Sequence, residues 1–475
     1  MPKISEPPSP VVLLGSLSAI ETDCACPTPP LMGTTSALVT GLWSAAPELH
    51  SEQLSGDWSL YCNPLMGGPP AVLNGEAVRR LQAFAAPQPL REAVDQRLAE
   101  AYLVVPEAHV PAAPQGAPDT LTAWLHITNA CNLECPYCYI RKSAAKMSLE
   151  TGIKAVDSLI ATARRRGFTG LKLKYAGGEA ALHFRMVQQL HAYAAERARE
   201  AGIALRAVVL SNGTVMPAAF AAWLAANDVR LMISVDGIGQ EHDAQRPWRG
   251  GGAGAFAALE RNLRERLLPS GIRPDICITV TGATAHSACH AVAWALAHGL
   301  PFSLNFYRES DQSTTHRHLR LEEQQLIAGL LQAYNVVEQA LPDQPFLDGL
   351  LDLVRAQAHG HTCGVGQNYV VISHEGQVAQ CQMELEHARP FDPGADLIAL
   401  VAAGPLHNHS VDDKEGCRSC VWRYRCAGGC PIVTMRATGR TDVKSPNCNI
   451  YKALMPAALR LEGLRLLKLA QARSV

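Results

Sequence analysis

The sequence has neither a long apolar run nor an excess of charge of either sign. Its 475 residues carry 42 Lys and Arg against 43 Asp and Glu, which gives a formal charge of −1. A nucleic-acid partner favours a basic patch, and a membrane span needs about 18 or more consecutive apolar residues. The apolar stretch Val11–Ile20 is too short, and no small-residue cleavage site follows it. We therefore expect no nucleic-acid partner, no membrane and no export.

Cysteine, in contrast, is abundant: the chain has fifteen, clustered rather than spread. Disulfide frameworks are typical of small exported chains, whereas clustered thiols in a reducing compartment serve as metal ligands. The sequence therefore predicts a cytoplasmic protein whose cysteines hold metal. Outside the clusters, Cys62, Cys277 and Cys289 are predicted to be core thiols. Cys24 and Cys26 are ordinary cysteines, spare ligands or a regulatory pair.

The first cluster is the loop Cys131-Asn-Leu-Glu-Cys135-Pro-Tyr137-Cys138, directly after the apolar run Leu121–Thr128. Thiolates are the preferred ligands of iron–sulfur clusters, and three cysteines leave one iron of a four-iron cluster open. The spacing differs from that of paired zinc ligands and from the four-cysteine ferredoxin run. The alternatives are cysteines that bind zinc or that are buried as small apolar side chains.

This loop resembles that of the radical S-adenosylmethionine (SAM) enzymes, in which Tyr137 would lie beside the cofactor. The resemblance implies that a reduced [4Fe-4S] cluster on these three cysteines binds SAM at its open iron and donates an electron to it. SAM would then break into methionine and a 5′-deoxyadenosyl radical, which takes a hydrogen atom from the substrate. A flavodoxin- or ferredoxin-type protein would supply the electron.

Residues 119–345 alternate strand and helix patterns, which predicts a parallel sheet with helices outside it. Right-handed crossovers curl such a sheet toward a barrel. Helices are expected at Leu149–Arg166, Phe184–Ala201 and Met216–Asn227. We predict an α/β fold, the partial (β/α)6 TIM-like barrel that the resemblance implies, with strands at Leu121–Thr128, Gly170–Tyr175, Ala204–Leu210, Val229–Val235, Asp275–Val280 and Phe302–Phe306.

Polar motifs follow several of these strands, at the barrel end where active sites lie. Taken alone, Gly177-Gly178-Glu179 is an ordinary turn and Arg246 a solvated charge. By resemblance, Gly177, Gly178 and Glu179 hold the SAM amino group. Ser211 and Asn212 contact the ribose, and Ser234 with Arg246 receives the SAM carboxylate, to which a guanidinium is well matched. Asn305, Tyr307 and Arg308 would face the substrate without a defined role.

The second cysteine cluster resembles the SPASM extension of radical SAM maturases, and it predicts a cysteine-rich domain over 346–475. A C-x2-C pair also fits zinc, but seven cysteines do not divide into closed four-cysteine zinc sites. The resemblance implies two auxiliary [4Fe-4S] clusters, three clusters in all. Their ligands would be Cys417, Cys420, Cys426 and Cys448 for one, and Cys363, Cys381 and Cys430 for the other.

Two departures from the family pattern matter. An eighth cysteine expected before Cys363 is replaced by Gln357-Ala-His359-Gly-His361, so either a histidine is the fourth ligand or one iron is open to a substrate thiolate. Gln382 stands where sulfatase-maturing members have a basic Asp, and an amide cannot accept a proton in that way. Formylglycine formation is therefore disfavoured, although Glu384 and Glu386 lie nearby.

The N-terminal part carries weaker patterns. Residues 1–55 are predicted to be a weakly ordered leader, and 110–119 a Pro/Gly/Ala-rich linker. Residues 56–110 predict a strand at Trp58–Tyr61 and helices at Gly75–Phe84 and Leu90–Ala101. This order resembles the small winged-helix domains that bind a leader peptide, or it forms a cap on the barrel. An amphipathic helix is expected at Tyr451–Leu469.

Together these features predict a radical SAM/SPASM enzyme that modifies a ribosomally made peptide or a partner protein, by a thioether or carbon–carbon crosslink. The alternatives are a radical SAM oxidase or epimerase that acts on a small molecule, and a non-catalytic iron–sulfur electron carrier or scaffold. The Gly177–Glu179 and Ser234 motifs argue against a carrier, which needs no SAM pocket.

Overall fold

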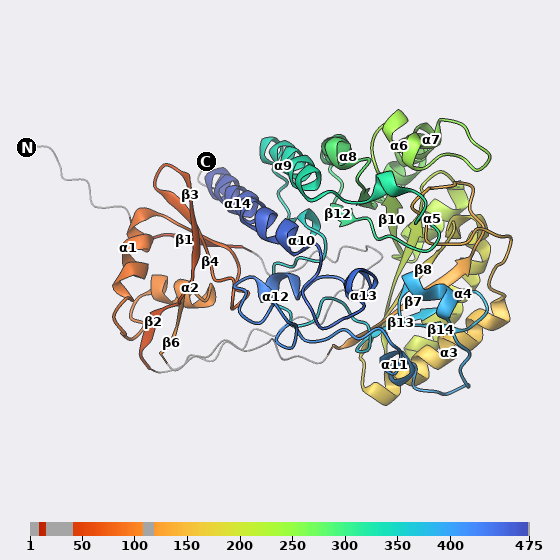
Figure 1. Ribbon diagram of the computed structural model, residues 1–475, viewed down its shortest axis with the longest axis horizontal. Coiled ribbons are helices and arrows are strands. Elements are labelled where there is room, and N and C mark those ends of the chain that lie inside the picture. Colours follow the sequence, from red (N-terminus) through yellow and green to blue (C-terminus); the bar gives the residue numbers. More distant parts are fainter. Residues whose placement is uncertain (1–8, 16–40, 108–117, 474–475) are drawn as a thin grey trace, which may run out of the picture.

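The computed structural model describes residues 9–15, 41–107 and 118–473 (Figure 1). Its largest element is an eight-stranded sheet in the order β12-β11-β10-β9-β8-β7-β13-β14. Six strands run parallel in chain order, which confirms the predicted six-unit partial barrel. They are β7 (Thr120–Thr128), β8 (Gly170–Gly177), β9 (Ala204–Ser211), β10 (Arg230–Ser234), β11 (Asp275–Val280) and β12 (Phe302–Phe306).

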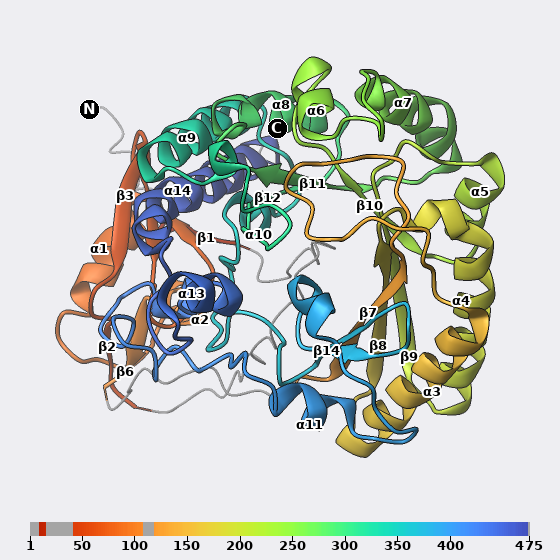
Figure 2. The same ribbon diagram turned by 45° about the vertical axis from the view of Figure 1, so that its right-hand side comes forward.

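Helices cover the outer face of this curved sheet (Figure 2). The first of them shows how the sequence sets its bounds: the Ser148 hydroxyl accepts from Thr151 N–H at the start, and Gly167 ends the helix with φ +74°. The main helices are α3 (Leu149–Arg166), α4 (Phe184–Glu200), α5 (Ala218–Ala226), α6 (Gln240–Gln245), α7 (Ala255–Asn262), α8 (Ala288–Ala297) and α9 (Glu323–Gln339). The three helices predicted in this region are therefore confirmed to within two residues at each end.

The cysteine-rich part extends the barrel sheet itself. Strand β13 (Tyr369–Ile372) pairs parallel with β7, and β14 (Val378–Ala379) pairs antiparallel with β13. This hairpin lies between Cys363 and Cys381, and it carries both cysteines to the strand that leads into the Cys131 loop. Short helices follow at α10 (Leu347–Leu350), α11 (Leu397–Ala402), α12 (Arg423–Cys426) and α13 (Pro431–Thr438).

The N-terminal part is a separate layer, with an antiparallel sheet in the order β1-β5-β4-β3. Helices α1 (Gly75–Ala83) and α2 (Ala93–Glu100) pack on this sheet, and both helices and the strand at 58–61 match the prediction. The strands are β1 (Val12–Leu14), β3 (His50–Ser55), β4 (Trp58–Cys62) and β5 (Ala71–Leu73), with β2 (Trp43–Ala45) paired to β6 (Val104–Pro106).

The prediction of a weakly ordered leader over 1–55 is wrong for the described part, because β1, β2 and β3 lie within it. These strands have three to six residues and little apolar periodicity, so pairing with distant strands such as β5 determines them. Residues 1–8 and 16–40, which include Cys24 and Cys26, lie outside the described residues, as does most of the predicted linker at 110–119.

The C-terminal helix joins the two layers. Helix α14 (Cys448–Arg473) includes the predicted Tyr451–Leu469 and packs against α9 of the barrel and against β1, β3 and β5. Figure 1 shows it running between the N-terminal sheet and the barrel helices. In the part of the chain that the structure describes, no helix combines the length and the apolar character that crossing a membrane requires.

A buried arginine fastens the N-terminal layer to the cysteine-rich domain. Arg425 is fully buried, and it donates to the Gly68 carbonyl (2.7 Å), to Cys62 Sγ (3.1 Å) and to the Ala356 carbonyl. Beside it the backbone of Gly67 lies directly on Ala358, so that a Cβ at Gly67 would stand 2.0 Å from the Ala358 Cβ. At this point the N-terminal layer and the cysteine-rich domain therefore meet with no room for another side-chain atom.

We expect Gly67→Ala to destabilise the protein more than Gly56→Ala does. The two glycines have nearly the same φ, +60° and +55°, but a Cβ at Gly56 meets nothing within 4 Å. The left-handed conformation costs either alanine about 1–2 kcal/mol, and overpacking adds about 1–3 kcal/mol at Gly67 alone. Urea unfolding and limited proteolysis of both variants measure the difference. Equal stabilities would show that the layers do not dock as described.

Candidate active site

One cavity opens at the carboxyl ends of the barrel strands, where such folds carry their chemistry. It gathers nearly all the site residues predicted in the barrel, the exception being Glu179. Those that line it are Cys131, Cys135, Cys138, Tyr137, Gly177, Gly178, Ser211, Asn212, Ser234 and Arg246, with Asn305, Tyr307 and Arg308 on another part of its wall.

The cysteine loop is held by backbone contacts to the segment that follows helix α6. Glu134 N–H donates to the Pro247 carbonyl (2.9 Å), and Arg249 N–H to the Asn132 carbonyl (2.8 Å). Asn212 Nδ2 lies 3.8 Å from Cys131 Sγ. The loop is thus attached both to the segment after α6 and to the end of β9.

Burial shapes the chemistry of the three thiols. It raises the pKa of Cys131, and it raises the pKa of Cys135 to about 12. Burial also lowers the pKa of Lys142, but the Cys138, Cys131 and Cys135 thiolates outweigh it and leave that pKa raised. Buried thiolates need positive charge close by, so this arrangement fits a bound iron–sulfur cluster with Lys142 beside it.

Two glycines let the end of β8 lie directly on the cysteine loop. A Cβ at Gly177 would stand 2.4 Å from the Thr128 carbonyl oxygen, and one at Gly178 would stand 2.2 Å from that of Ala130. Gly177 also has φ +146°. The cavity wall is therefore bare backbone here, open to close approach by a ligand.

Glu179 follows these glycines but turns its carboxylate away from the cavity. It accepts from Ala181 N–H (3.0 Å), Ser211 Oγ (2.8 Å) and Asn212 N–H (2.7 Å), and it is fully buried. Burial raises its pKa, and these donors act in the opposite direction. In this structure the side chain braces the end of β8 against the end of β9. The contact of Glu179 with the SAM amino group stays a prediction.

Glu179→Gln is expected to destabilise the fold by about 1–3 kcal/mol, because an amide NH2 would then face donors that need an acceptor. Denaturant unfolding measures the loss. Glu150→Gln is the matched control, since Glu150 is exposed and pairs only with exposed Lys154 on α3. Equal stability of the two variants would contradict the role of Glu179 in joining the ends of β8 and β9.

Arg246 is held by a carboxylate that the sequence analysis did not single out. Its Nε donates to Asp236 Oδ2 (2.6 Å), Tyr137 donates its hydroxyl to the same oxygen, and Thr279 N–H donates to Asp236 Oδ1 (2.8 Å). The guanidinium also lies 5.4 Å from the centre of the Tyr137 ring. Arg246 is buried, so it is not the solvated charge considered as the alternative. Asp236 directly follows Ser234-Val235 at the end of a strand, and that position was the sequence signal that could have identified it.

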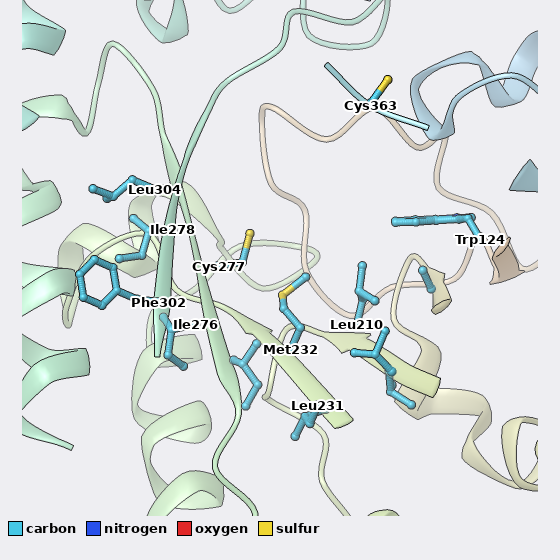
Figure 3. Packing of buried hydrophobic residues seen from close by; sticks show 14 of the residues in the cluster. Trp124, Leu210, Leu231, Met232, Ile276, Cys277, Ile278, Phe302, Leu304 and Cys363 are labelled. Carbon is cyan, nitrogen blue, oxygen red and sulfur yellow. The ribbon is translucent and has the colours of Figure 1, made fainter. Parts of the chain in front are cut away.

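The substrate side of the cavity is neutral or cationic. Among the described residues that line it, none is Asp, Glu or His. Cys277 was predicted to be a core thiol; it is buried, yet it lines the cavity and accepts from Asn305 Nδ2 (3.2 Å). Figure 3 shows Cys277 on the opposite side of β11 from Ile276 and Ile278.

Three cysteines of the second cluster lie in a pocket that adjoins the barrel cavity. Cys363, Cys381 and Cys430 line one small pocket, and Arg308, Gln382 and Met383 line both this pocket and the barrel cavity. No histidine lines the pocket in the described chain; His359 Nδ1 is instead 3.2 Å from the Gln357 carbonyl. Burial lowers the pKa of His359 to about 3.

The other four cysteines form a group of their own. The pKa of Cys417 and that of Cys426 are raised, chiefly by burial, with contributions from the other cysteines of the set Cys417, Cys420, Cys426 and Cys448. Within the described ranges, no three His, Cys, Asp or Glu side chains converge closely enough to hold a single metal ion.

Comparisons with known proteins agree with this geometry. Residues 125–286 match the Radical SAM superfamily. An uncharacterized protein of Methanocaldococcus jannaschii is 27% identical over 151 residues, 31% of this chain and 50% of that protein. An S-adenosylmethionine-dependent nucleotide dehydratase of Psychrobacter lutiphocae is 27% identical over 123 residues, 24% of this chain and 39% of that protein. The chain thus spans half or less of these curated relatives.

A solved structure resembles a larger share of the chain. Native anSMEcpe with bound AdoMet and Cp18Cys peptide superposes with a TM-score of 0.59 and 19% identity. The match covers 75% of this chain and 100% of that one. At this identity the likeness shows the fold.

Proposed function

We propose, on the premise that the chain contains a radical SAM domain at residues 125–286, that the protein cleaves SAM and modifies a ribosomally made peptide or a partner protein. One observation carries the proposal. A single cavity brings Cys131, Cys135 and Cys138 together with the bare backbone of Gly177 and Gly178 and with the buried Arg246. When bound, a [4Fe-4S] cluster and SAM supply an electron and a 5′-deoxyadenosyl radical there.

The residues of this chain would bind and orient SAM. Arg246, fixed by Asp236, offers a guanidinium to the SAM carboxylate, which it matches in shape and charge. The backbone at Gly177 and Gly178 is accessible to the amino group, while Ser211, Asn212 and Ser234 offer polar atoms to the rest of the molecule.

Two auxiliary [4Fe-4S] clusters belong to the proposal, held by the sets of three and four cysteines. The set of three adjoins the barrel cavity through Arg308, Gln382 and Met383. Since neither His359 nor His361 lines that pocket, we propose that one iron there is open and accepts a substrate thiolate. A cysteine-containing peptide would then be held beside the radical. One hydrogen atom would pass to the 5′-deoxyadenosyl radical, a second hydrogen would leave as a proton with its electron taken up by an auxiliary cluster, and a thioether or carbon–carbon crosslink would result.

Two features support a peptide substrate. The anSMEcpe structure that resembles this chain has both AdoMet and the Cp18Cys peptide bound. The N-terminal layer, with its antiparallel sheet and two helices docked against the cysteine-rich domain, would bind the leader part of such a peptide, as the winged-helix likeness suggests. The reductant would be a flavodoxin- or ferredoxin-type protein.

The test uses the reconstituted full chain, SAM, a reductant and the peptide encoded beside this gene. Mass spectrometry should show the loss of two hydrogens per crosslink, and the loss should vanish when the peptide cysteines are replaced by Ser. Matched incubations with no SAM control for chemical oxidation. Release of 5′-deoxyadenosine with an unchanged peptide would refute the peptide substrate and favour a small-molecule oxidase or epimerase.

A further inference from the structure

A buried lysine lies between the two auxiliary cysteine sets, and nothing in the proposed function uses it. Lys414 is 1% exposed, although lysine is almost never buried without a partner. We propose that Lys414 is a positioning residue whose fixed ammonium group sets the reduction potentials of both auxiliary clusters together. The inference rests on the proposed function, because it assumes that both sets hold clusters.

The ammonium contacts connect the two sets. Lys414 Nζ donates to the Ala427 carbonyl (2.8 Å) and approaches Thr362 Oγ1 (3.4 Å). Thr362 Oγ1 in turn donates to the carbonyls of Ala427 and Gly429, both at 2.8 Å. These three residues are the direct chain neighbours of Cys426, Cys363 and Cys430. Lys414 therefore fixes the backbone from which ligands of both sets project.

The absence of a side chain at Gly428 leaves space for the side chain of Lys414. Gly428 has φ +78°, and a Cβ there would stand 2.6 Å from Lys414 Cδ, 3.1 Å from its Nζ and 3.3 Å from Cys417 Sγ. A single added carbon would thus touch both the lysine and a cluster ligand. The lysine side chain and the Cys417 sulfur together adjoin the position that a Cβ at this glycine would take.

The charges around Lys414 come from both sets. Burial lowers its pKa, and the thiolates that act most strongly in the opposite direction are Cys417, Cys363, Cys426 and Cys430. Two of these belong to each proposed cluster. Net charge and hydrogen bonding near the sulfurs set the potential of an iron–sulfur cluster. A cation in a poorly screened interior favours the reduced, more negative state of both clusters, so its removal lowers both potentials.

The test is a redox titration of the anaerobically reconstituted full chain, followed by electron paramagnetic resonance, with iron counted per chain. Lys414→Met should keep its iron and shift both auxiliary potentials to more negative values, while the Cys131 cluster stays unchanged. Lys414→Arg, which keeps the charge, should stay near wild type. Lys452→Met is the matched control, because Lys452 also acts on Cys417 but is exposed.

Unchanged auxiliary potentials in Lys414→Met, or a shift in only one of them, would overturn the inference. If Lys414→Met loses iron, Lys414→Arg decides between the explanations. Wild-type iron content and potentials in Lys414→Arg would support a role for the positive charge, whereas loss of iron in this variant too would overturn the inference. Wild-type protein without auxiliary iron would refute the proposed clusters themselves. Three clusters with unaffected potentials would instead refute only the role of Lys414.

Discussion

Replacing Cys131, Cys135 and Cys138 together by Ala is expected to abolish release of 5′-deoxyadenosine from SAM. Iron should fall from about twelve to about eight atoms per chain, since each cubane cluster holds about four. The three thiols line the cavity with Gly177 and Gly178, whereas the other seven proposed ligands lie in separate groups. The loss should therefore be confined to one cluster while both others remain.

The measurement pairs an iron assay with chromatography of the nucleoside after addition of SAM and dithionite. Cys289→Ala is the matched control: Cys289 is a partly exposed cysteine on α8, remote from the three ligand sets, and its variant should keep both iron and activity. Nucleoside release by the triple variant at the wild-type rate would place the SAM chemistry elsewhere in the protein.

Removing the carboxylate of Asp236 is expected to weaken both the fold and SAM binding. Asp236→Ala leaves Arg246 buried without its ion-pair partner, and breaking a buried pair in this way costs about 3–5 kcal/mol. The same change frees the Tyr137 hydroxyl and the Thr279 N–H, which both donate to this carboxylate. Because Arg246 then loses its fixed orientation, SAM affinity should fall at least about tenfold, or about 1.4 kcal/mol.

Denaturant unfolding and calorimetric titration of the reconstituted protein with SAM measure the two effects. Asp236→Asn, which retains one oxygen acceptor, should lie between Ala and wild type in both. Glu150→Gln on α3 provides a control, since its ion pair with Lys154 is exposed and such pairs contribute about 0–1 kcal/mol. Wild-type stability and SAM affinity in Asp236→Ala would refute the role assigned to this carboxylate.

The six barrel strands were predictable because each is a segment of five or more residues rich in apolar side chains, with a helical pattern after it. β11 and β12 match their predicted bounds, and β7, β8, β9 and β10 differ by two residues or fewer. By contrast, β13 and β14 have only four and two residues. Their pairing depends on the edge of β7, which no local pattern reveals.

In the site, too, some features follow from local sequence patterns and others only from tertiary packing. Cysteine spacing and motif position identified the residues that line the cavity. They did not show that Glu179 points into the protein, because that orientation depends on the backbone N–H groups of distant Asn212. Asp236 and Lys414 were missed for a related reason. Each is an ordinary charged residue in sequence, and only burial beside Arg246 or beside two cysteine sets distinguishes it.

The most direct test of this account is the nucleoside released by the wild-type protein, reconstituted anaerobically with iron and sulfide and then given SAM and dithionite. The account predicts 5′-deoxyadenosine that depends on both the reductant and the iron, from a protein with about twelve irons per chain. Zinc in place of iron, or no nucleoside under any reductant, would contradict it and leave a metal-binding scaffold in its place.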